Sequence, residues 1–401
     1  MKSNLPLKLL GSLALTSLLA ACGGSDGGSS AAPVVGENTV VVATVAADFS
    51  GSDIQLVELG SDVTVTSGVA GKDQSDFGAA RFGEFFYHIG RFNIDEVHKH
   101  GFIAPGTPIY QYTTQANAED PTGNAQRMAF VSNEKAYITQ YRTQQVLIVN
   151  PSAQTEAEFI IGSLDLSAYA DADANGAPEA SAAMIVDGKL FVVLQRLVNY
   201  SPAEDGVSAY VAVFDTATDT EIDTNPNDAP SVPKGIELST RNPGKLVYRD
   251  GVGLFLQSIG DAYASSRNGR TPGYTGGISK IDTETYSVEL IVDDGDNDNH
   301  PYGFISNLAI VDANNGYFVG YEGWMNTSLY HFNPSTGAAT AVTAYANIDM
   351  RTIEADAAGN LWIGIADSAS PRIEVLDGQQ SLLRTINLIQ NPTEILFSKM
   401  Q

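Results

Sequence analysis

Two acidic segments contain the residue types that bind calcium. The first places oxygen donors at alternate positions, Asp171, Asp173 and Asn175, and a glycine follows them where a metal loop turns sharply. An EF-hand would have a bidentate glutamate at the twelfth position, but Ala182 stands there, so the sequence offers Glu179 as the remaining ligand. We therefore expect an irregular calcium loop here, and the alternative is a hydrated acidic loop.

The second acidic segment, 293–300, crowds four aspartates into eight residues, and its candidate calcium ligands are Asp294, Asp296 and Asp298. Carboxylates this close repel one another unless a cation or free solvation relieves the repulsion. A second calcium site is one interpretation, and a solvated acidic loop is the other.

His98 and His100 would lie on one face of a strand, because side chains two residues apart in a strand point the same way. Two imidazoles on one face are compatible with zinc or copper. No third ligand stands nearby in the sequence, so we favour an exposed basic patch.

A further group of residues combines aromatic rings with arginine, glutamine and acidic side chains. Such side chains suit a planar or sugar-like ligand, through stacking and a few fixed hydrogen bonds. The candidate ligand-binding residues are Arg91, Tyr141, Arg142, Gln195, Arg196, Tyr263, Tyr321, Glu322 and Trp324. The alternative is a set of strand-end aromatic residues and solvated charges.

Catalytic motifs are absent from the predicted folded body. Residues 38–401 contain no Gly-x-Ser-x-Gly, no His-Glu-x-x-His and no phosphate-binding glycine loop. The single cysteine, Cys22, precedes the predicted folded body, so thiol chemistry is excluded there. The residues therefore give no positive support to an enzyme.

The elements that position these residues are short strands. Runs of β-branched and aromatic residues recur between Gly, Asp, Asn and Pro, and many of them pair across a polar loop. The seven predicted pairs are 40–42 with 54–56, 85–87 with 92–95, 135–138 with 146–150, 189–192 with 211–215, 253–256 with 278–282, 316–319 with 329–333, and 360–363 with 373–377. The 364 residues from Asn38 to the end, divided by seven, give 52 per unit, which fits a four-stranded propeller blade of about 40–50 residues.

Two of these units continue into an Asp-Thr-x-Thr turn, at 215–218 and 282–285. With these turns and with strands such as Gly188-Lys-Leu-Phe-Val192, the chain resembles the YVTN-type seven-bladed propellers of secreted bacterial proteins. The resemblance implies an all-β fold over residues 38–401, a seven-bladed β-propeller of four-stranded antiparallel blades. Eight blades or a pair of β-sandwiches are the alternatives. In a propeller, the loops between second and third strands share one face with the connectors between blades, and we expect the ligand there.

The N-terminus has the features of a secretory signal peptide over residues 1–21: lysines, a short apolar run and small residues before a cleavage site. Leu19-Ala-Ala-Cys22 resembles the bacterial lipobox, which implies acylation of Cys22. Residues 22–37 are rich in glycine and serine and should form a flexible tether. Gly23 follows the cysteine where an inner-membrane retention signal usually has aspartate, which favours the outer membrane.

The charge of the mature chain limits its partners. Without residues 1–21 it keeps 20 of the 22 basic residues and all 47 acidic ones, a net charge of −27. Such a field repels nucleic acid. We expect an outer-membrane lipoprotein that captures a small molecule or glycan-like ligand and passes it to an outer-membrane transporter. The alternatives are an interaction scaffold in a cell-envelope complex and a calcium-dependent propeller hydrolase or lactonase.

Overall fold

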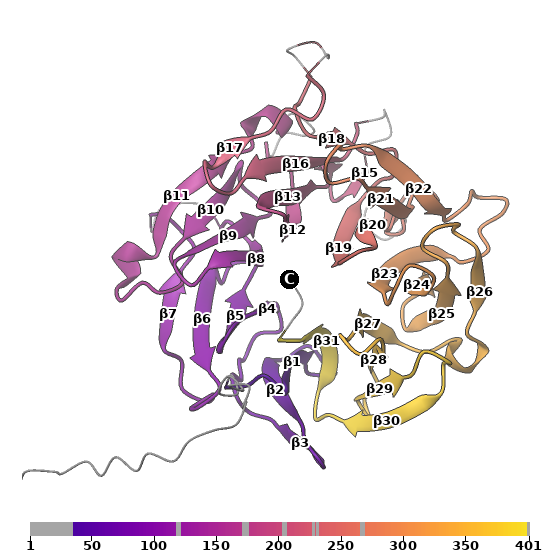
Figure 1. Cartoon of the computed structure of the whole chain (residues 1–401), viewed down its shortest axis with the longest axis horizontal. Helices are drawn as coiled ribbons and strands as arrows, with labels where there is room; N and C mark the ends of the chain where they lie inside the picture. Colours follow the sequence, from indigo (N-terminus) through magenta and orange to yellow (C-terminus); the bar gives the residue numbers. More distant parts are fainter. Residues whose placement is uncertain are drawn as a thin grey trace, which may run out of the picture. The chain divides into compact units, whose positions relative to one another are not determined.

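The computed structural model describes residues 35–117, 122–170, 176–202, 207–226, 229, 232–264 and 269–398. Within these ranges the chain forms seven antiparallel sheets arranged around a central axis, one sheet to a blade (Figure 1). This confirms the predicted all-β, seven-bladed propeller. Among the same residues, no helix is long and apolar enough to cross a membrane.

Each blade runs from an inner strand at the axis to an outer strand at the rim. From inside outward, blades 1 to 3 are β31 (Asn391–Leu396), β1 (Thr39–Val45), β2 (Ser52–Leu59) and β3 (Val63–Thr66); β4 (Phe77–Phe82), β5 (Phe85–Gly90), β6 (Glu96–Gly101) and β7 (Tyr110–Thr113); and β8 (Ala125–Ser132), β9 (Lys135–Gln140), β10 (Gln145–Val149) and β11 (Ile160–Asp165).

Blade 4 has an extended outer half. It consists of β12 (Ala180–Val186), β13 (Lys189–Leu194) and β16 (Tyr210–Asp215), and both β17 (Thr220–Glu221) and β18 (Ile236–Glu237) pair with β16. A small hairpin of β14 (Leu197–Val198) and β15 (Ser201–Pro202) is inserted between its second and third strands.

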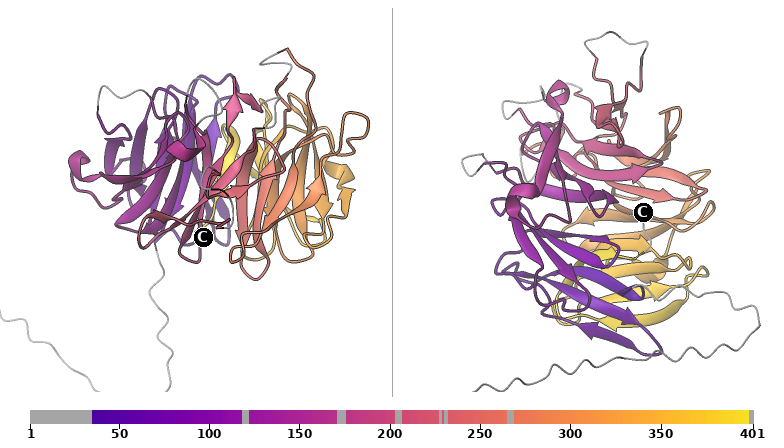
Figure 2. Two further views of the ribbon diagram at one scale, coloured as in Figure 1. Left: turned by 90° about the horizontal axis from the view of Figure 1, so that it is seen from above. Right: turned by 60° about the vertical axis from the view of Figure 1, so that its left-hand side comes forward.

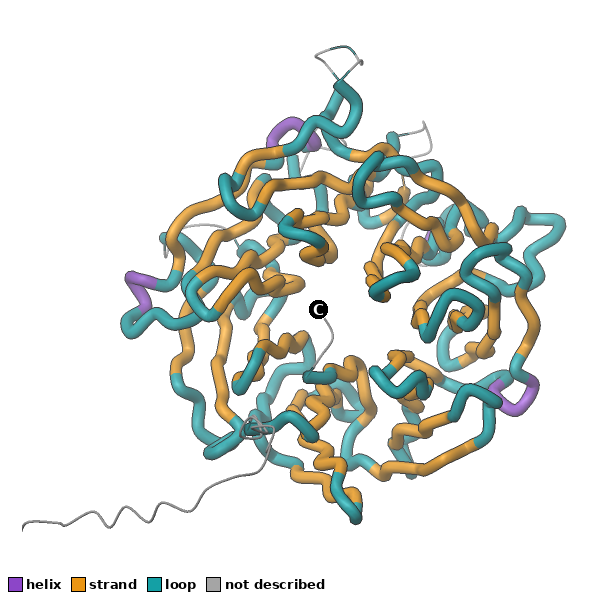
Figure 3. The backbone as a smooth tube through the Cα atoms, viewed as in Figure 1, coloured by secondary structure: helices purple, strands orange, loops and turns teal. Residues whose placement is uncertain are grey.

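Blades 5 to 7 return to the simple four-stranded pattern: β19 (Pro243–Arg249), β20 (Gly253–Ser258), β21 (Gly277–Ile281) and β22 (Val288–Asp293); β23 (Phe304–Ile310), β24 (Gly316–Gly323), β25 (Asn326–Phe332) and β26 (Ala339–Ala341); and β27 (Met350–Ala355), β28 (Leu361–Ile365), β29 (Arg372–Leu376) and β30 (Leu382–Asn387). The short 3₁₀ helices η1 (Glu156–Glu158), η2 (Ser167–Tyr169) and η3 (Thr343–Tyr345) lie between strands toward the rim (Figure 3).

The apolar core is divided among the interfaces between neighbouring blades. The second strand of each blade packs between two other sheets, so strands such as β20 and β28 are buried on both faces and consist largely of apolar residues. Trp362, for example, packs with residues of blade 1 across the interface between blades 7 and 1. Outer strands such as β30 face solvent and are mostly exposed.

The ring closes by joining the two ends of the chain. β31, near the C-terminus, pairs antiparallel with β1, near the N-terminus, and supplies the inner strand of blade 1. Residues 39–45 and 391–396 thus meet in one blade, whereas residues 386–387 end β30 of blade 7. Closure removes the two unpaired sheet edges that an open ring would have.

The predicted strand pairs are observed in six of the seven units. The exception is blade 2, where 92–95 is a turn and the partner of β5 is β6, which begins at Glu96. Asn93 and Asp95 both have positive φ, at 58° and 51°, which a strand does not allow. The apolar residues Phe92 and Ile94 made this turn resemble a strand in the sequence.

The Asp-Thr-x-Thr motif has a direct local cause. The Oδ1 atom of Asp215 accepts hydrogen bonds from the backbone N–H groups of Ala217 and Thr218, both at 2.9 Å. Asp282 caps its own turn in the same way. These hydrogen bonds favour the ionised form and lower the pKa of both carboxyl groups. The turns join third to fourth strands, on the face opposite the expected ligand face.

Candidate ligand-binding face

The strands of the propeller run between two loop-bearing faces (Figure 2). Because neighbouring strands are antiparallel, the loops between second and third strands emerge on the same face as the connectors between blades. We call this the ligand face. Loop 46–51, the turn at Gly323–Asn326 and the connector 346–349 all belong to it.

An exposed aromatic cluster on the ligand face brings three blades together. The rings of Phe49 from blade 1 and Trp324 from blade 6 have centroids 6.0 Å apart. The guanidinium of Arg351, at the start of the inner strand of blade 7, lies 5.4 Å from each ring centroid. Trp324 is 67% exposed and Phe49 is 44% exposed, so ring surface remains open to solvent.

Local backbone geometry presents the two rings. Phe49 has a φ of 60°, and its N–H donates to the carbonyl of Ala46 at 2.9 Å, which closes a tight loop. Trp324 stands in the turn between β24 and β25, where Gly323 pairs with Asn326. Turn positions leave side chains outside the sheet ladder, so both rings project from the face rather than into a blade.

Arg351 is held in place by an acid. Its Nη2 lies 3.0 Å from Oδ2 of Asp349, and its Nε approaches both carboxylate oxygens of Asp349 at 3.3 Å. A forked pair of this kind fixes the plane of the guanidinium. Because Asp349 balances its charge, the cluster offers a flat polar surface beside two rings rather than a free cation.

Sequence reasoning identified Trp324 but missed Phe49 and Arg351. Tyr321 and Tyr263, two other predicted residues, form an edge-to-face pair with ring centroids 6.0 Å apart. Burial raises the pKa of Tyr321 above its usual range. Glu322, between Tyr321 and the turn, is exposed.

Tyr274, another residue missed from the sequence, is stacked between His300 and Phe304, at centroid distances of 4.1 and 4.3 Å. Tyr274 lies in the loop between β20 and β21, His300 in the connector from blade 5 to blade 6, and Phe304 begins β23, so the three rings meet at the ligand face. The only signal in the sequence is the density of aromatic residues in 259–304.

The predicted residues of blades 3 and 4 form a polar relay. The hydroxyl of Tyr141 donates to Oε1 of Gln195 at 2.7 Å, and Nε2 of Gln195 donates to the carbonyl of Pro243 at 2.9 Å. This connects three successive blades at the ligand face. Arg196 is 8% exposed and donates to the carbonyls of Tyr169 and Ser208, so its guanidinium is engaged inside the blade.

Two predicted ligand-binding arginines, Arg91 and Arg142, contact residues of neighbouring loops instead. Arg91 pairs with Asp76 at 2.8 Å. Arg142 lies over the exposed ring of Phe92, 5.3 Å from its centroid. The structure thus places Arg91 and Arg142 on the ligand face but apart from the cluster of Phe49, Trp324 and Arg351.

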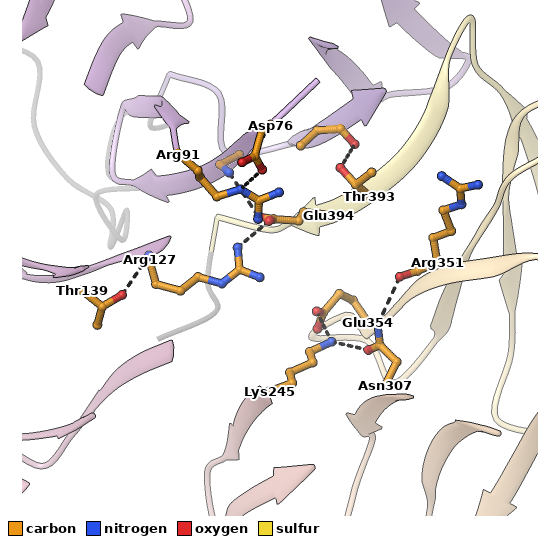
Figure 4. Close-up of polar contacts among 12 residues, drawn as sticks. Asp76, Arg91, Arg127, Thr139, Lys245, Asn307, Arg351, Glu354, Thr393 and Glu394 are labelled. Atoms are coloured by element: carbon orange, nitrogen blue, oxygen red, sulfur yellow. Dashed lines mark hydrogen bonds and ion pairs between the residues drawn. The ribbon is translucent and has the colours of Figure 1, made fainter. Parts of the chain in front are cut away.

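Charged side chains of the inner strands form cross-blade contacts around the axis (Figure 4). Arg127 pairs with Glu394, and Lys245 pairs with Glu354 while donating to Oδ1 of Asn307 at 3.0 Å. Glu394 raises the pKa of Arg127, whereas burial raises the pKa of Glu354 against the opposing effect of Lys245. The two acids and two bases of these pairs balance one another in charge.

These axial residues were also missed from the sequence. Each is a charge within a short inner strand whose other residues are mostly uncharged. Such a charge can be recognised as axial only once the register of the inner strands is known.

The first acidic segment is only partly visible, since Asp171, Asp173 and Asn175 lie outside the described residues. Glu179 is buried, with a φ of 51°, and its carboxylate accepts a hydrogen bond from the N–H of Leu197 at 2.8 Å. One carboxylate oxygen of Glu179 is therefore committed to the backbone of the inserted hairpin.

The second acidic segment does not converge on one point. Both oxygens of Asp294 accept from the N–H of Gly276 at 3.1 Å, and the residue is fully buried. Burial raises its pKa to about 7. Asp296 instead caps its own turn by accepting from the N–H groups of Asp298 and Asn299.

His98 and His100 do share one face of β6, as predicted, but they are 2% exposed each, so the expected exposed basic patch is wrong. His88, on β5, pairs in register with His98, and the blade packs these imidazoles beside Lys72 of the preceding connector. In the part of the chain that the structure describes, no group of three or more His, Cys, Asp or Glu side chains is arranged to hold a metal ion.

Comparisons with known proteins give the fold alone. The structure is similar to that of a putative 6-phosphogluconolactonase from Bacteroides fragilis. The two chains are 11% identical, the match covers 91% of this chain and all of that one, and the TM-score is 0.57. The structure is also similar to that of a streptogramin B lyase, at 11% identity, over 83% of this chain and 92% of that one, with a TM-score of 0.50. Apo AztD from Citrobacter koseri has 15% identity over 89% of this chain and 96% of that one, with a TM-score of 0.47.

No protein-family model matches the sequence, and no curated protein matches it. TM-scores of 0.57 and 0.50 at 11% identity show a shared fold and leave function to the site itself.

Proposed function

We propose that the protein is an outer-membrane lipoprotein that captures a planar or sugar-like small molecule on its ligand face and passes it to an outer-membrane transporter. The observation that carries the proposal is the exposed cluster of Phe49, Trp324 and Arg351, drawn from three blades. Exposed rings of this size are costly to leave in water, and a ligand that stacks on them removes that apolar surface from solvent.

The surrounding polar groups favour a neutral ligand. Arg351 is already paired with Asp349, and the mature chain is strongly acidic, so an anionic ligand gains little from the field of the protein. The guanidinium still has N–H groups at its edge that can donate to hydroxyl or carbonyl oxygens. Stacking plus a few directional hydrogen bonds is the usual chemistry of sugar and heterocycle recognition.

The direct test is mass spectrometry of small molecules released from the full-length protein purified from envelopes. We expect Trp324→Ala to reduce the recovered ligand about tenfold, because a stacked ring contributes ~0.5–1.5 kcal/mol beyond the area that it buries. Leu382→Ala, an exposed apolar position on outer strand β30, is the matched control and should recover ligand as the wild type does. If Trp324→Ala recovers as much ligand as the wild type, the cluster of Phe49, Trp324 and Arg351 is not the ligand site.

Tryptophan fluorescence gives an independent readout. The chain has two tryptophans, and Trp362 is buried in the interface between blades 7 and 1. A ligand that stacks on the cluster should therefore change the emission of Trp324 and leave that of Trp362 unaltered. Trp324→Phe should keep binding and lose most of the fluorescence response.

The anchor is tested separately. We expect Cys22→Ser to prevent acylation and to release the protein into soluble fractions, because acyl chains provide ~0.8 kcal/mol per buried CH₂. Membrane fractionation of the wild type and the variant measures this. Retention of the variant in membranes at the wild-type level would contradict the lipid anchor.

The alternatives make different demands on the same face. A scaffold in an envelope complex would bury the cluster of Phe49, Trp324 and Arg351 against another protein and co-purify with it. A calcium-dependent hydrolase or lactonase would need a bound cation with an open coordination position beside an acid. The neighbour described as a putative 6-phosphogluconolactonase shares only the fold at 11% identity and does not favour the second alternative.

A further inference from the structure

The face opposite the ligand face carries an apolar loop without charged residues. Loop 102–109 joins the third and fourth strands of blade 2, and its sequence is Phe-Ile-Ala-Pro-Gly-Thr-Pro-Ile. Ile103 is 86% exposed and Ile109 is 58% exposed. Eight consecutive uncharged residues with two exposed isoleucines stand out in a chain so rich in acidic side chains.

A cavity of about 370 Å³ lies beside this loop. It is lined mainly by apolar side chains from three segments: Val35, Phe85, Phe102, Ile103, Pro108 and Ile109. We call these six residues the apolar patch. Val35 is the first residue of the described body, so the patch lies where the N-terminal segment joins the propeller.

This junction is fixed rather than free. The guanidinium of Arg81 donates to the carbonyls of Gly36, at 2.6 Å, and Thr39, and it lies 4.7 Å from the ring centroid of Phe102. Gly36 has a φ of 79°, and a side chain there would collide with Phe102. Arg81 is 8% exposed, so these contacts lie inside the body and hold the start of the chain against blade 2.

Chain length ties the patch to the acylated cysteine. Twelve residues separate Cys22 from Val35. A Gly/Ser-rich segment of this length has an end-to-end distance of roughly 20 Å on average, and about 45 Å fully extended. A lipid anchor at Cys22 therefore keeps the apolar patch within that distance of the bilayer. The anchor raises the effective concentration of lipid at the patch, so a second contact between protein and membrane needs little affinity of its own.

We propose that the apolar patch docks on the bilayer surface that holds the anchor, with Ile103 and Ile109 inserted among the lipids. The inference rests on the anchor in the proposed function. A patch this small would bind a membrane weakly by itself, but a tethered body needs only a weak second contact. Zwitterionic lipid is the expected surface, because the net charge of −27 opposes anionic headgroups. Docking directs the ligand face away from the membrane.

The single cysteine makes the test direct. In the lipidated protein the thiol of Cys22 is acylated, so Ile103→Cys provides the sole thiol for an environment-sensitive dye. Ile389→Cys is the matched control, because Ile389 is 70% exposed and lies in a connector on the ligand face. On phosphatidylcholine vesicles we expect blue-shifted emission, and quenching by nitroxide lipids, at position 103 and not at 389.

A second variant tests the energetics. With the dye at Thr107→Cys, Ile103→Asp should lower the ratio of docked to undocked protein about tenfold, because it removes an inserted isoleucine. Ile389→Asp should leave this ratio unchanged. Both positions are exposed, so neither substitution threatens folding. Equal quenching at 103 and 389, or no effect of Ile103→Asp, overturns the proposal.

Failure of the anchor and failure of docking give different results. Absence of an acyl group on Cys22 by mass spectrometry refutes the anchor. The docking test then proceeds on vesicles with nickel-chelating lipids, with a histidine tag in place of residues 1–22, and reads the same dye positions. A blue shift at position 103 without vesicles would show that a second copy covers the patch, which also overturns docking on lipid.

Discussion

The two faces of the propeller differ in chemistry although the same strands carry both. On the ligand face, side chains from different blades contact one another, as Phe49, Trp324 and Arg351 do. On the opposite face, most turns are closed by local caps such as Asp215 and Asp282, and blade 2 adds an uncharged apolar loop.

The difference follows from what each set of loops must do. The turns between third and fourth strands complete one blade and are closed by local caps. Single contacts from the preceding blade, such as Lys135 with Asp219 at 2.8 Å, brace them without forming a shared site. Connectors and loops on the ligand face come near the axis, where neighbouring blades converge, so their side chains can form sites that no single blade contains. We therefore expect substitutions that disturb the packing between blades to alter the ligand face more than the opposite face.

The largest predicted effect comes from breaking the ring. Deleting residues 386–401 removes β31 and, with it, Ile386, Leu388 and Ile395, which are buried in the interface between blades 7 and 1. Each such side chain contributes ~1.5–3 kcal/mol on burial, so the sum rivals the 5–15 kcal/mol typical of a folded domain. Aggregation or loss of cooperative thermal unfolding is the expected result.

Deletion of residues 399–401 alone is the control, because it leaves every described strand intact. Size-exclusion chromatography and thermal melting compare the two deletions. If the longer deletion stays monomeric and melts at the wild-type temperature, then pairing of β31 with β1 does not close the ring.

Much of this architecture could be predicted from the sequence, because each blade repeats the same strand pair. Six pairs are visible as β-branched and aromatic runs around polar loops. The predicted strand 92–95 of blade 2 was wrong because Phe92 and Ile94 are apolar residues in a turn. The positive φ values of Asn93 and Asp95 leave no clear pattern in the sequence. Local propensity is a weak guide where tertiary contacts decide the backbone.

The site was less predictable, for a topological reason. Phe49 and Trp324 are 275 positions apart, and their blades flank blade 7 only because the ring closes through β31. Arg351 lies within an inner strand, and nothing near it in sequence marks it as a partner for two rings. By contrast, Tyr321 near the end of β24 and Trp324 in the turn that follows are three residues apart and were recognisable as candidates.

A smaller effect should come from Asp294, which lies beneath the ligand face. Its pKa is raised to about 7 by burial, whereas an unfolded chain would have it near 3.8. The stability contributed by the neutral form is complete below about pH 4 and is lost as the pH rises to about 7. Asp294→Asn keeps an acceptor for the N–H of Gly276 and removes this titration.

We therefore expect Asp294→Asn to melt about 2 °C or more above the wild type at pH 8 and to show a flatter dependence of melting temperature on pH between 4 and 7. Parallel pH profiles for the two proteins would show that Asp294 does not titrate in this window. Both proteins should be measured in chelator, because a cation near Asp294 would favour its ionised form.

The smallest expected effect concerns calcium, and it tests whether Asp171, Asp173 and Asn175, which lie outside the described residues, bind a cation. A cation that binds only the folded state stabilises it by RT ln(1 + [L]/Kd), or ~2.7 kcal/mol at a hundredfold excess over Kd. For a chain of this size, that should raise the melting temperature by at least about a degree or two. Chelator should lower the melting temperature of the wild type, and Asp171→Ala with Asp173→Ala should remove most of that sensitivity. Asp296→Ala, in the other acidic segment, is the matched control, because Asp296 caps its own turn and should not carry the response. If the wild type melts identically in calcium and in chelator, this segment is a solvated acidic loop and the two faces differ in side-chain chemistry alone.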